Sequence, residues 1–377
     1  LRLPAQCLRM LPLGLLLSVQ FCLAWLFLNF AAGRLIFSDD NPSFLYRLAI
    51  LQAHFPKLGL YNPEWNAGFP MTELPVVGVL GIFALAWPLL ALGGNIATLD
   101  GASTYTLLIP YLFILVVPWS VLFATRLLGF DSLVAALAGL LALGPTVAYF
   151  EWLLKYGTIG FVLSAGLFPL CFALCYRLAI GEATLRYAHA LLAAAVSFVV
   201  LSWPMSGVAF VPLLILACMS PQRLFTAERL PKLGLFVALV LISYGPVFSA
   251  TLFQSRAAAI FTAEKSVAQS SAAESQQKSE SRHNKKATAS GDKIDGAEEN
   301  TVSAGIQSAW TRLAGPLMRF NPLIVVFFIP GLLLLPDRRL RAAIFFTLSW
   351  LFLLGGFADL LRPQLEFKRI FVHISFL

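Results

Sequence analysis

The sequence predicts an all-α membrane protein, a polytopic bundle of about ten transmembrane helices with interfacial helices in its first loop. Of its 377 residues, 59% are hydrophobic and only 12% are charged, about half the usual charged share. A soluble fold has too small an interior to bury that much apolar surface. Uncharged runs at 11–30, 104–124 and 320–335 have the character of segments that cross a hydrocarbon core about 30 Å thick.

The net charge of +8 indicates a lipid bilayer as partner and not a nucleic acid, because the basic residues stand at the ends of apolar runs. Cytoplasmic ends of membrane helices carry such residues. They are Arg2, Arg9, Arg177, Arg186, Arg223, Arg229, Lys232, Arg338, Arg339 and Arg341.

Apolar runs place the expected spans at 11–36, 75–93, 104–126, 132–150, 158–180, 187–202, 206–219, 233–253, 319–335 and 340–360. The first run exceeds the apolar part of a signal peptide and no convincing cleavage site follows, so we expect a retained signal-anchor helix. The chain begins without Met and stops inside an apolar stretch. We therefore expect a fragment whose C-terminal part is missing.

The expected orientation contains a conflict. Arg177 belongs on the cytoplasmic side with Arg2, yet five spans between them would put the two on opposite sides. One of the five must be broken, re-entrant or miscounted. The segment 75–93 is the suspect, because Gly78, Pro88 and a Gly-Gly pair at 93–94 interrupt it.

Composition divides the chain into three parts. Residues 1–254 form an N-terminal transmembrane module whose first loop, 37–73, is expected outside the cytoplasm. Residues 255–311 form a polar loop, and 312–377 carry further transmembrane helices. Between 263 and 303 there is no Leu, Phe, Trp, Tyr or Pro. Such a segment buries too little apolar area to offset its ordering entropy, so we expect it to be disordered.

The first loop begins with a predicted amphipathic helix over 42–55. Asn41 is a favourable N-cap and Pro42 a favourable first helical residue, while Pro56 and Gly59 end the segment. Apolar side chains recur on one stripe, which predicts a helix lying in the membrane interface. The stripe consists of Phe44, Leu45, Leu48, Leu51 and Phe55.

Two adjacent acids, Asp39 and Asp40, precede this helix. Helix capping accounts for one of them, since a carboxylate gains up to about 1 kcal/mol at a helix N-terminus. Two acids at a membrane boundary suit a second role. A carboxylate there can act as general base, or as metal ligand, toward a substrate whose lipid tail stays in the bilayer.

The first loop resembles that of the GT-C superfamily of polytopic membrane glycosyltransferases, in particular its poorly characterised bacterial members. The shared pattern is a first helix, an acidic pair, an interfacial helix and a P-x-W-x-x-G-x-P turn, here at 63–70. The resemblance implies transfer of a sugar from a polyprenyl-phosphate donor to an acceptor outside a bacterial plasma membrane. It also implies that Asp40 or Asp39 is the catalytic base.

The resemblance places five candidate substrate-binding residues in the same loop, namely Arg47, His54, Lys57, Glu64 and Trp65. Each has an ordinary alternative: His54 suits the polar face of an interfacial helix, and Trp65 suits an interface anchor. A metal-dependent branch of the family would need a second acidic cluster. Only Glu151, four residues before Lys155, is a candidate, and these two side chains also suit a helical ion pair. The cofactor, including a divalent metal, is left open.

Two other functions compete with glycosyl transfer. A transporter or flippase of lipid-linked saccharide would be expected to carry intramembrane ionisable residues or repeat symmetry, and apart from 151–155 the expected spans show neither. A non-catalytic relative with the same fold is the other alternative, because a fold does not fix a function.

Overall fold

The described residues of the computed structural model are mostly helical and include no strand. Elements named below are α-helices, except for the π-helices η2 and η3 and the 3-10 helix η4. The described residues are 5–32, 34, 38–56, 78–98, 101–145, 147–180, 188–212, 330–335, 337–361, 371–374 and 376, with single positions at 215, 231, 234, 237, 238 and 241.

Four helical stretches in this part of the chain are long and apolar enough to cross a membrane. The first is α1 (Ala5–Ala31), the third α7 (Ile159–Ile180) and the fourth α14 (Arg338–Leu361). The second is continuous through α4 (Gly101–Ile109), η2 (Pro110–Val116) and α5 (Val117–Leu127). The all-helical membrane architecture is thus supported, whereas the expected spans at 233–253 and 319–335 lie almost entirely outside the described residues.

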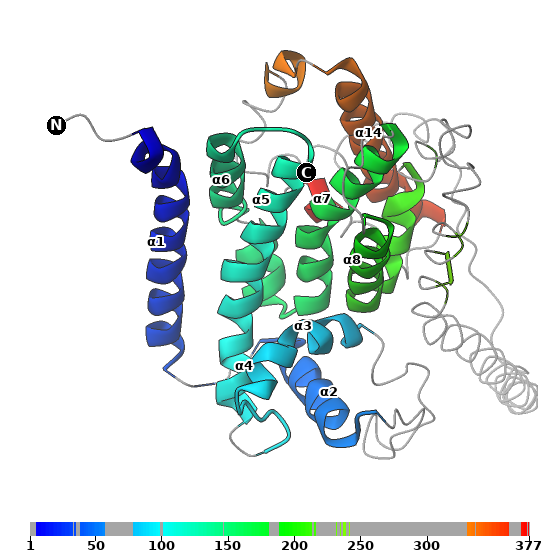
Figure 1. The fold of residues 1–377 in the computed structure, drawn as a ribbon. Coiled ribbons are helices and arrows are strands. Elements are labelled where there is room, and N and C mark those ends of the chain that lie inside the picture. Colours follow the sequence, from blue (N-terminus) through cyan, green and yellow to red (C-terminus); the bar gives the residue numbers. More distant parts are fainter. Residues whose placement is uncertain are drawn as a thin grey trace, which may run out of the picture.

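The bundle has two distinct ends (Figure 1). At the lower end in that view, α2 (Asn41–His54) and α3 (Leu80–Ala91) lie across the ends of the long helices. The Gln52 side chain of α2 donates to the carbonyl of Gly94 at 3.2 Å and accepts from the N–H of Ile96 at 2.6 Å. We call this the α2 end. The N-terminus of α1 lies at the opposite end.

The 75–93 segment, suspected above, is not one of the four candidate spans. Its described helix, α3, has 12 residues and is about 18 Å long. The segment that follows α3 is hydrogen-bonded to α2 through the Gly94 carbonyl. In Figure 1 the chain descends in α1, rises through α4 to α5, descends through α6 (Ser132–Leu141) and η3 (Val147–Lys155) and rises in α7, so α7 ends on the side of the bundle where α1 begins.

The expected continuous span at 132–150 is wrong. The structure divides it into α6 (Ser132–Leu141) and η3 (Val147–Lys155). Gly144 and Pro145 lie between the two pieces, and proline both lacks an N–H and disfavours the helical conformation of the preceding residue. The start of α6 is capped as its sequence suggests, because the Asp131 carboxylate accepts from the Val134 N–H at 2.8 Å.

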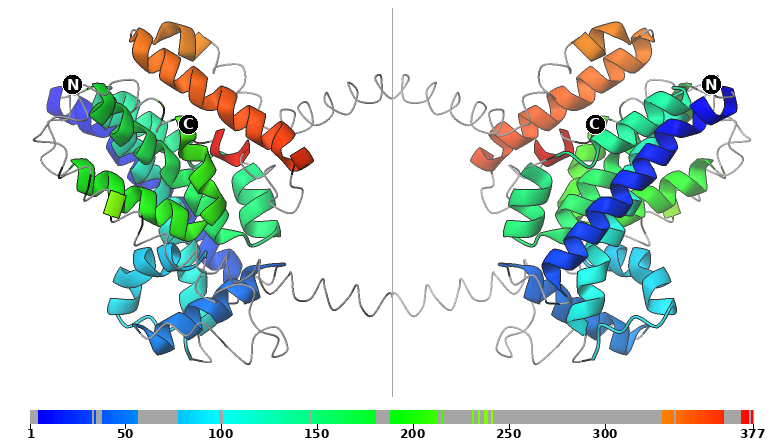
Figure 2. Two further views of the ribbon diagram at one scale, coloured as in Figure 1. Left: turned by 90° about the vertical axis from the view of Figure 1, so that its right-hand side faces the viewer. Right: turned by 90° about the vertical axis from the view of Figure 1, so that its left-hand side faces the viewer.

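The centre of the bundle is built from α5, α7 and α8 (Ala188–Ser202), while α1 runs along the outside (Figure 2). Small residues allow close packing at the centre. A Cβ on Gly166 would meet the Val117 side chain at 2.7 Å, and Ser120 donates to the Gly166 carbonyl at 3.1 Å. Such approaches of small residues are typical of packed membrane helices.

At the end opposite α2, the Tyr176 hydroxyl donates to the Asp337 carboxylate at 2.6 Å and joins α7 to the start of α14. This hydrogen bond is the main reason why the pKa of Asp337 lies below its usual range. A lowered folded-state pKa stabilises the folded protein above the usual Asp value of about 3.9, and that stabilisation is lost as the pH falls through the lowered value.

Tyr176→Phe is therefore expected to destabilise the protein near pH 7 by less than about 1 kcal/mol, because Asp337 is solvent-exposed and solvent screens its charge. Thermal unfolding in detergent, followed from pH 7 to pH 3, checks this. The difference in stability between variant and parent should become smaller toward pH 3. A stability difference that does not change with pH would show that the hydroxyl contributes only packing.

Candidate functional site

The predicted acidic pair lies in a turn at the α2 end, immediately before α2. Asp39 is exposed and Asp40 is half-buried. The Asp40 N–H donates to the carbonyl of Tyr156 at 3.0 Å, which ties the turn to the segment that enters α7. The acids therefore lie beside the starts of two helices, α2 and α7, whose positive ends favour negative charge nearby.

The predicted N-cap is wrong by one residue. Asp40 occupies the cap position, but its carboxylate makes no capping hydrogen bond, and Asn41 is the first residue of α2. Asn41 is fully buried and its side chain holds the turn in another way. Its Nδ2 donates to Ser38 Oγ at 2.6 Å, and its Oδ1 accepts from the hydroxyl of Tyr105 on α4 at 2.7 Å.

Gly157 completes the support of this turn. It has a φ of +69°, a conformation that glycine adopts without the cost a Cβ brings. A Cβ at this position would come within 2.6 Å of the Asn41 nitrogen and 2.7 Å of its Nδ2. The backbone at 156–157 and the buried asparagine thus fit directly against each other, and together they fix where Asp40 lies.

Arg47 is the substrate-binding candidate that the structure places nearest the acidic turn. It lies seven residues after Asp40, about two helical turns and 10 Å along the axis, and so on the same side of α2. Its guanidinium lies 5.6 Å from the centre of the Phe44 ring. A Cβ on Gly78, at the entry to α3, would meet Arg47 Nη2 at 3.7 Å and the Ser202 carbonyl at 3.6 Å.

Aromatic side chains line the segments next to the turn. Trp152 on η3 lies 5.2 Å from Tyr156 and 5.3 Å from Phe161, measured between ring centroids. Phe161 in turn lies 5.0 Å from Trp203, at the tip between α8 and η4 (Pro204–Phe210). The ammonium of Lys155 lies 4.9 Å from the centre of the Tyr156 ring. The aromatic faces could stack against an uncharged ring, and the Lys155 ammonium could contact an anionic group.

The remaining candidates are not brought to this turn by the described structure. His54 is exposed at the far end of α2, about 20 Å from Asp40 along the helix. Lys57, Glu64 and Trp65 lie outside the described residues. Glu151 lies on η3 and is half-buried, and its carbonyl accepts from the Tyr156 N–H at 3.1 Å. Glu151, the only candidate for a second acidic cluster, therefore lies in the segment that leads to Tyr156.

Sequence reasoning missed the residues that support the turn. Tyr105 and Asn41 are 64 positions apart, and nothing in the local sequence links them. Gly157 signals a turn after the 147–155 segment, but nothing in the sequence links it to Asn41. Among the described residues, no group of three or more His, Cys, Asp or Glu side chains is arranged to hold a metal ion.

Comparisons of the chain with protein families, with curated proteins and with solved structures found no match.

Proposed function

We propose that this chain is a membrane glycosyltransferase of the GT-C type, which transfers a sugar from a polyprenyl-phosphate donor to a hydroxyl acceptor. The observation that carries the proposal is the acidic turn at the α2 end. Asp40 is held there by its own backbone and by the buried Asn41, at the rim of a bundle with membrane-spanning character. A lipid-linked donor would present its phosphate and sugar at that rim.

The chemistry requires one base. The Asp40 carboxylate takes the proton of the acceptor hydroxyl while that oxygen bonds to the anomeric carbon of the donor sugar. The bond between this carbon and the phosphate oxygen breaks, and polyprenyl phosphate leaves with the electron pair. Arg47 is the cation on the same side of α2 that would meet the phosphate, and Asp39 provides a second carboxylate.

The proposed location is the plasma membrane of a bacterium, with the α2 end facing outward. Arg177 and Arg338 lie at the opposite end, joined through the contact of Tyr176 with Asp337, and basic helix ends favour the cytoplasm. α2 lies across the bundle end with Leu48 and Leu51 buried against it, as a helix at the membrane surface would.

A membrane-impermeant thiol reagent tests this orientation. In a cysteine-free background, Ser43→Cys at the start of α2 is expected to react in intact cells. Ser132→Cys, the first residue of α6 at the opposite end, is the matched control and should react only after permeabilisation. Labelling of Ser43→Cys from the cytoplasmic side alone would contradict the proposed orientation.

Incorporation of labelled sugar tests the activity. Membranes that contain the protein should transfer sugar from a polyprenyl-phosphate donor to endogenous acceptor, and membranes without it should not. Movement of the intact donor across the bilayer without transfer would identify a flippase. Neither transfer nor movement, with each of the common sugar donors, would favour a non-catalytic relative.

A further inference from the structure

The first turn of α14 carries a concentration of positive charge. Arg338, Arg339 and Arg341 are three of its first four residues, and Asp337 is the only acidic residue between 301 and 358. The N-terminus of a helix is its positive end, so the helix dipole disfavours cations there. These arginines therefore gain nothing from the dipole of their own helix, and an anion beside them would relieve their mutual repulsion.

Asp337 is already engaged by other groups. One carboxylate oxygen, Oδ2, accepts from the Tyr176 hydroxyl at 2.6 Å, and the other, Oδ1, accepts from the backbone N–H of Arg339 at 2.8 Å. The carboxylate thus serves the start of the helix and the contact with α7. Three arginines and one aspartate leave a net charge of +2 on the turn.

The three arginines do not share one role. Arg341 is half-buried, and its Nη2 donates to the Leu335 carbonyl at 2.6 Å, which holds the turn before α14. Arg338 and Arg339 are exposed. Two adjacent arginines can place their guanidinium groups around one phosphate, and the planar fork of each group matches phosphate oxygens. This pair is the part of the turn that can bind a ligand.

The exposed side of α14 is apolar below the arginines. The buried side consists of Leu340, Ala343, Thr347 and Leu351. At about 100° of rotation per residue, Arg338 lies on the opposite side of the helix, and Phe345 lies on that same side about 10 Å further along. Phe345 is 62% exposed. A cation followed by an exposed aromatic ring matches the order in which a phospholipid presents its phosphate and its acyl chains.

Apolar side chains also flank the turn on its other side. Leu333 and Leu334, in the helical segment 330–334 that precedes the turn, are 64% and 81% exposed. The turn lies at the end of the bundle opposite α2, where α14 begins (Figure 1). Exposed apolar residues before and after the turn would lie in water if the turn projected beyond the membrane. The arginines are therefore expected at the level of the lipid headgroups.

We propose that Arg338 and Arg339 bind the phosphate of an anionic phospholipid, whose acyl chains lie along Phe345. The ligand is a lipid and not a soluble anion, because the exposed side of α14 continues from the arginines into the hydrocarbon core. Basic residues are common at the cytoplasmic ends of spans, but that tendency concerns orientation and predicts no preference among lipids. The proposed site predicts such a preference, and it does not depend on the proposed glycosyl transfer.

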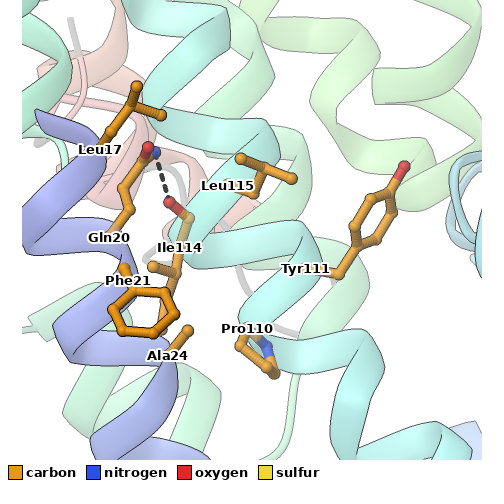
Figure 3. Close-up of a pocket in the computed structure, with 8 residues that line it drawn as sticks. All are labelled: Leu17, Gln20, Phe21, Ala24, Pro110, Tyr111, Ile114 and Leu115. Carbon is orange, nitrogen blue, oxygen red and sulfur yellow. Dashed lines mark hydrogen bonds between the residues drawn. The ribbon is translucent and has the colours of Figure 1, made fainter. Parts of the chain in front are cut away.

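A groove between α1 and η2 illustrates a lipid contact of the other kind (Figure 3). It has a volume of about 300 Å³, and apart from Gln20 its described lining residues are apolar or aromatic. The Gln20 amide is engaged within the protein, because its Nε2 donates to the Ile114 carbonyl at 2.7 Å. With no charge among the described residues that line it, this groove is expected to contact lipid tails whatever their headgroup.

Native mass spectrometry of the purified full chain tests the proposal. The chain is titrated with phosphatidylglycerol or with phosphatidylcholine of the same acyl chains. We expect the parent to bind its first phosphatidylglycerol about 25-fold more tightly than phosphatidylcholine, roughly fivefold for each arginine. Arg338→Gln combined with Arg339→Gln should bind the two lipids equally. A parent without this preference, or a double variant that keeps it, would overturn the proposal.

Two matched controls accompany this titration. Arg126 is exposed at the C-terminus of α5, at the same end of the bundle, and donates to the Phe130 carbonyl at 2.9 Å. Arg126→Gln should keep the preference, and its loss there would show that net charge and not a site is responsible. Phe21→Ala, at the groove between α1 and η2, should affect both lipids equally. Excess glycerol 3-phosphate should not displace the lipid, and displacement would assign the turn to a soluble anion.

Thermal unfolding in lipid nanodiscs separates lipid binding from folding. In phosphatidylcholine, the double glutamine variant should be at least as stable as the parent, because it removes two cations from the positive end of a helix. Phosphatidylglycerol should raise the melting temperature of the parent, since a ligand that binds the folded state stabilises it, and should leave that of the double variant unchanged. Equal stabilisation of both proteins by phosphatidylglycerol would contradict the proposed site.

Discussion

Gly157→Ala is expected to be among the most damaging single-methyl changes in the described part of this protein, lowering its stability by about 2–4 kcal/mol. Two costs combine. The residue has a φ of +69°, which an alanine adopts only with strain, and its new Cβ would lie 2.6 Å from the Asn41 nitrogen. Asn41 would have to move, and the acidic turn would move with it. Thermal unfolding in detergent gives the stability, and the sugar-transfer assay should show a parallel loss of activity.

Gly129→Ala is the matched control for this change. Gly129 also has a positive φ, +95°, but nothing lies within 4 Å of a Cβ at that position. Its substitution carries the conformational cost alone, about 1–2 kcal/mol. Activity at the remote acidic turn should be retained. Equal loss of stability and activity in both variants would show that the contact between Gly157 and Asn41 does not support the site.

Asp40→Asn is expected to lower sugar transfer by about a hundred to ten thousand fold, the usual contribution of a general base. Asparagine keeps the size and shape of the side chain and removes its ability to accept a proton. Asp39→Asn should be the next most damaging change, because Asp39 is the adjacent carboxylate in the same turn. Initial rates measured at matched protein abundance check both expectations.

The alternative role of these acids predicts the opposite pattern. If they served only to cap α2, both asparagine variants would lose a little stability and keep full turnover. The Asp40 carboxylate makes no capping hydrogen bond, so the capping role reduces to a helix-dipole interaction of a few tenths to about 1 kcal/mol. Asp131→Asn controls for the chemistry of the substitution, because Asp131 caps α6 and asparagine is an equally good cap.

The sequence predicted the helices whose ends carry strong signals. α2 was expected at 42–55 and is found at Asn41–His54, because Pro42 and Pro56 limit it on both sides. Of its expected apolar stripe, Leu48 and Leu51 are buried, whereas Phe55 is 50% exposed. The interruption of the second apolar run, 75–93, was also recognised, since glycines and a proline within a membrane segment favour a re-entrant or interfacial course.

The parts that sequence reasoning missed depend on contacts between distant segments. The π-helix η2 lies in a run that is apolar on every side, so no periodicity distinguishes a π-helix from an α-helix there. Asn41, the predicted cap, instead uses its side chain to accept from Tyr105 on another helix and to donate to Ser38. The support of the acidic turn is therefore a tertiary property, whereas the acids themselves were visible in the sequence.

The most direct test of the account is a product balance on the purified full chain in lipid nanodiscs, supplied with labelled polyprenyl-phosphate sugar and an acceptor. We expect labelled sugar to appear on the acceptor in an amount equal to the polyprenyl phosphate released. Asp40→Asn should nearly abolish both products, while Asp131→Asn should preserve them. Full product formation by Asp40→Asn, in an assay where the parent is active, would contradict the assignment of Asp40 as the catalytic base.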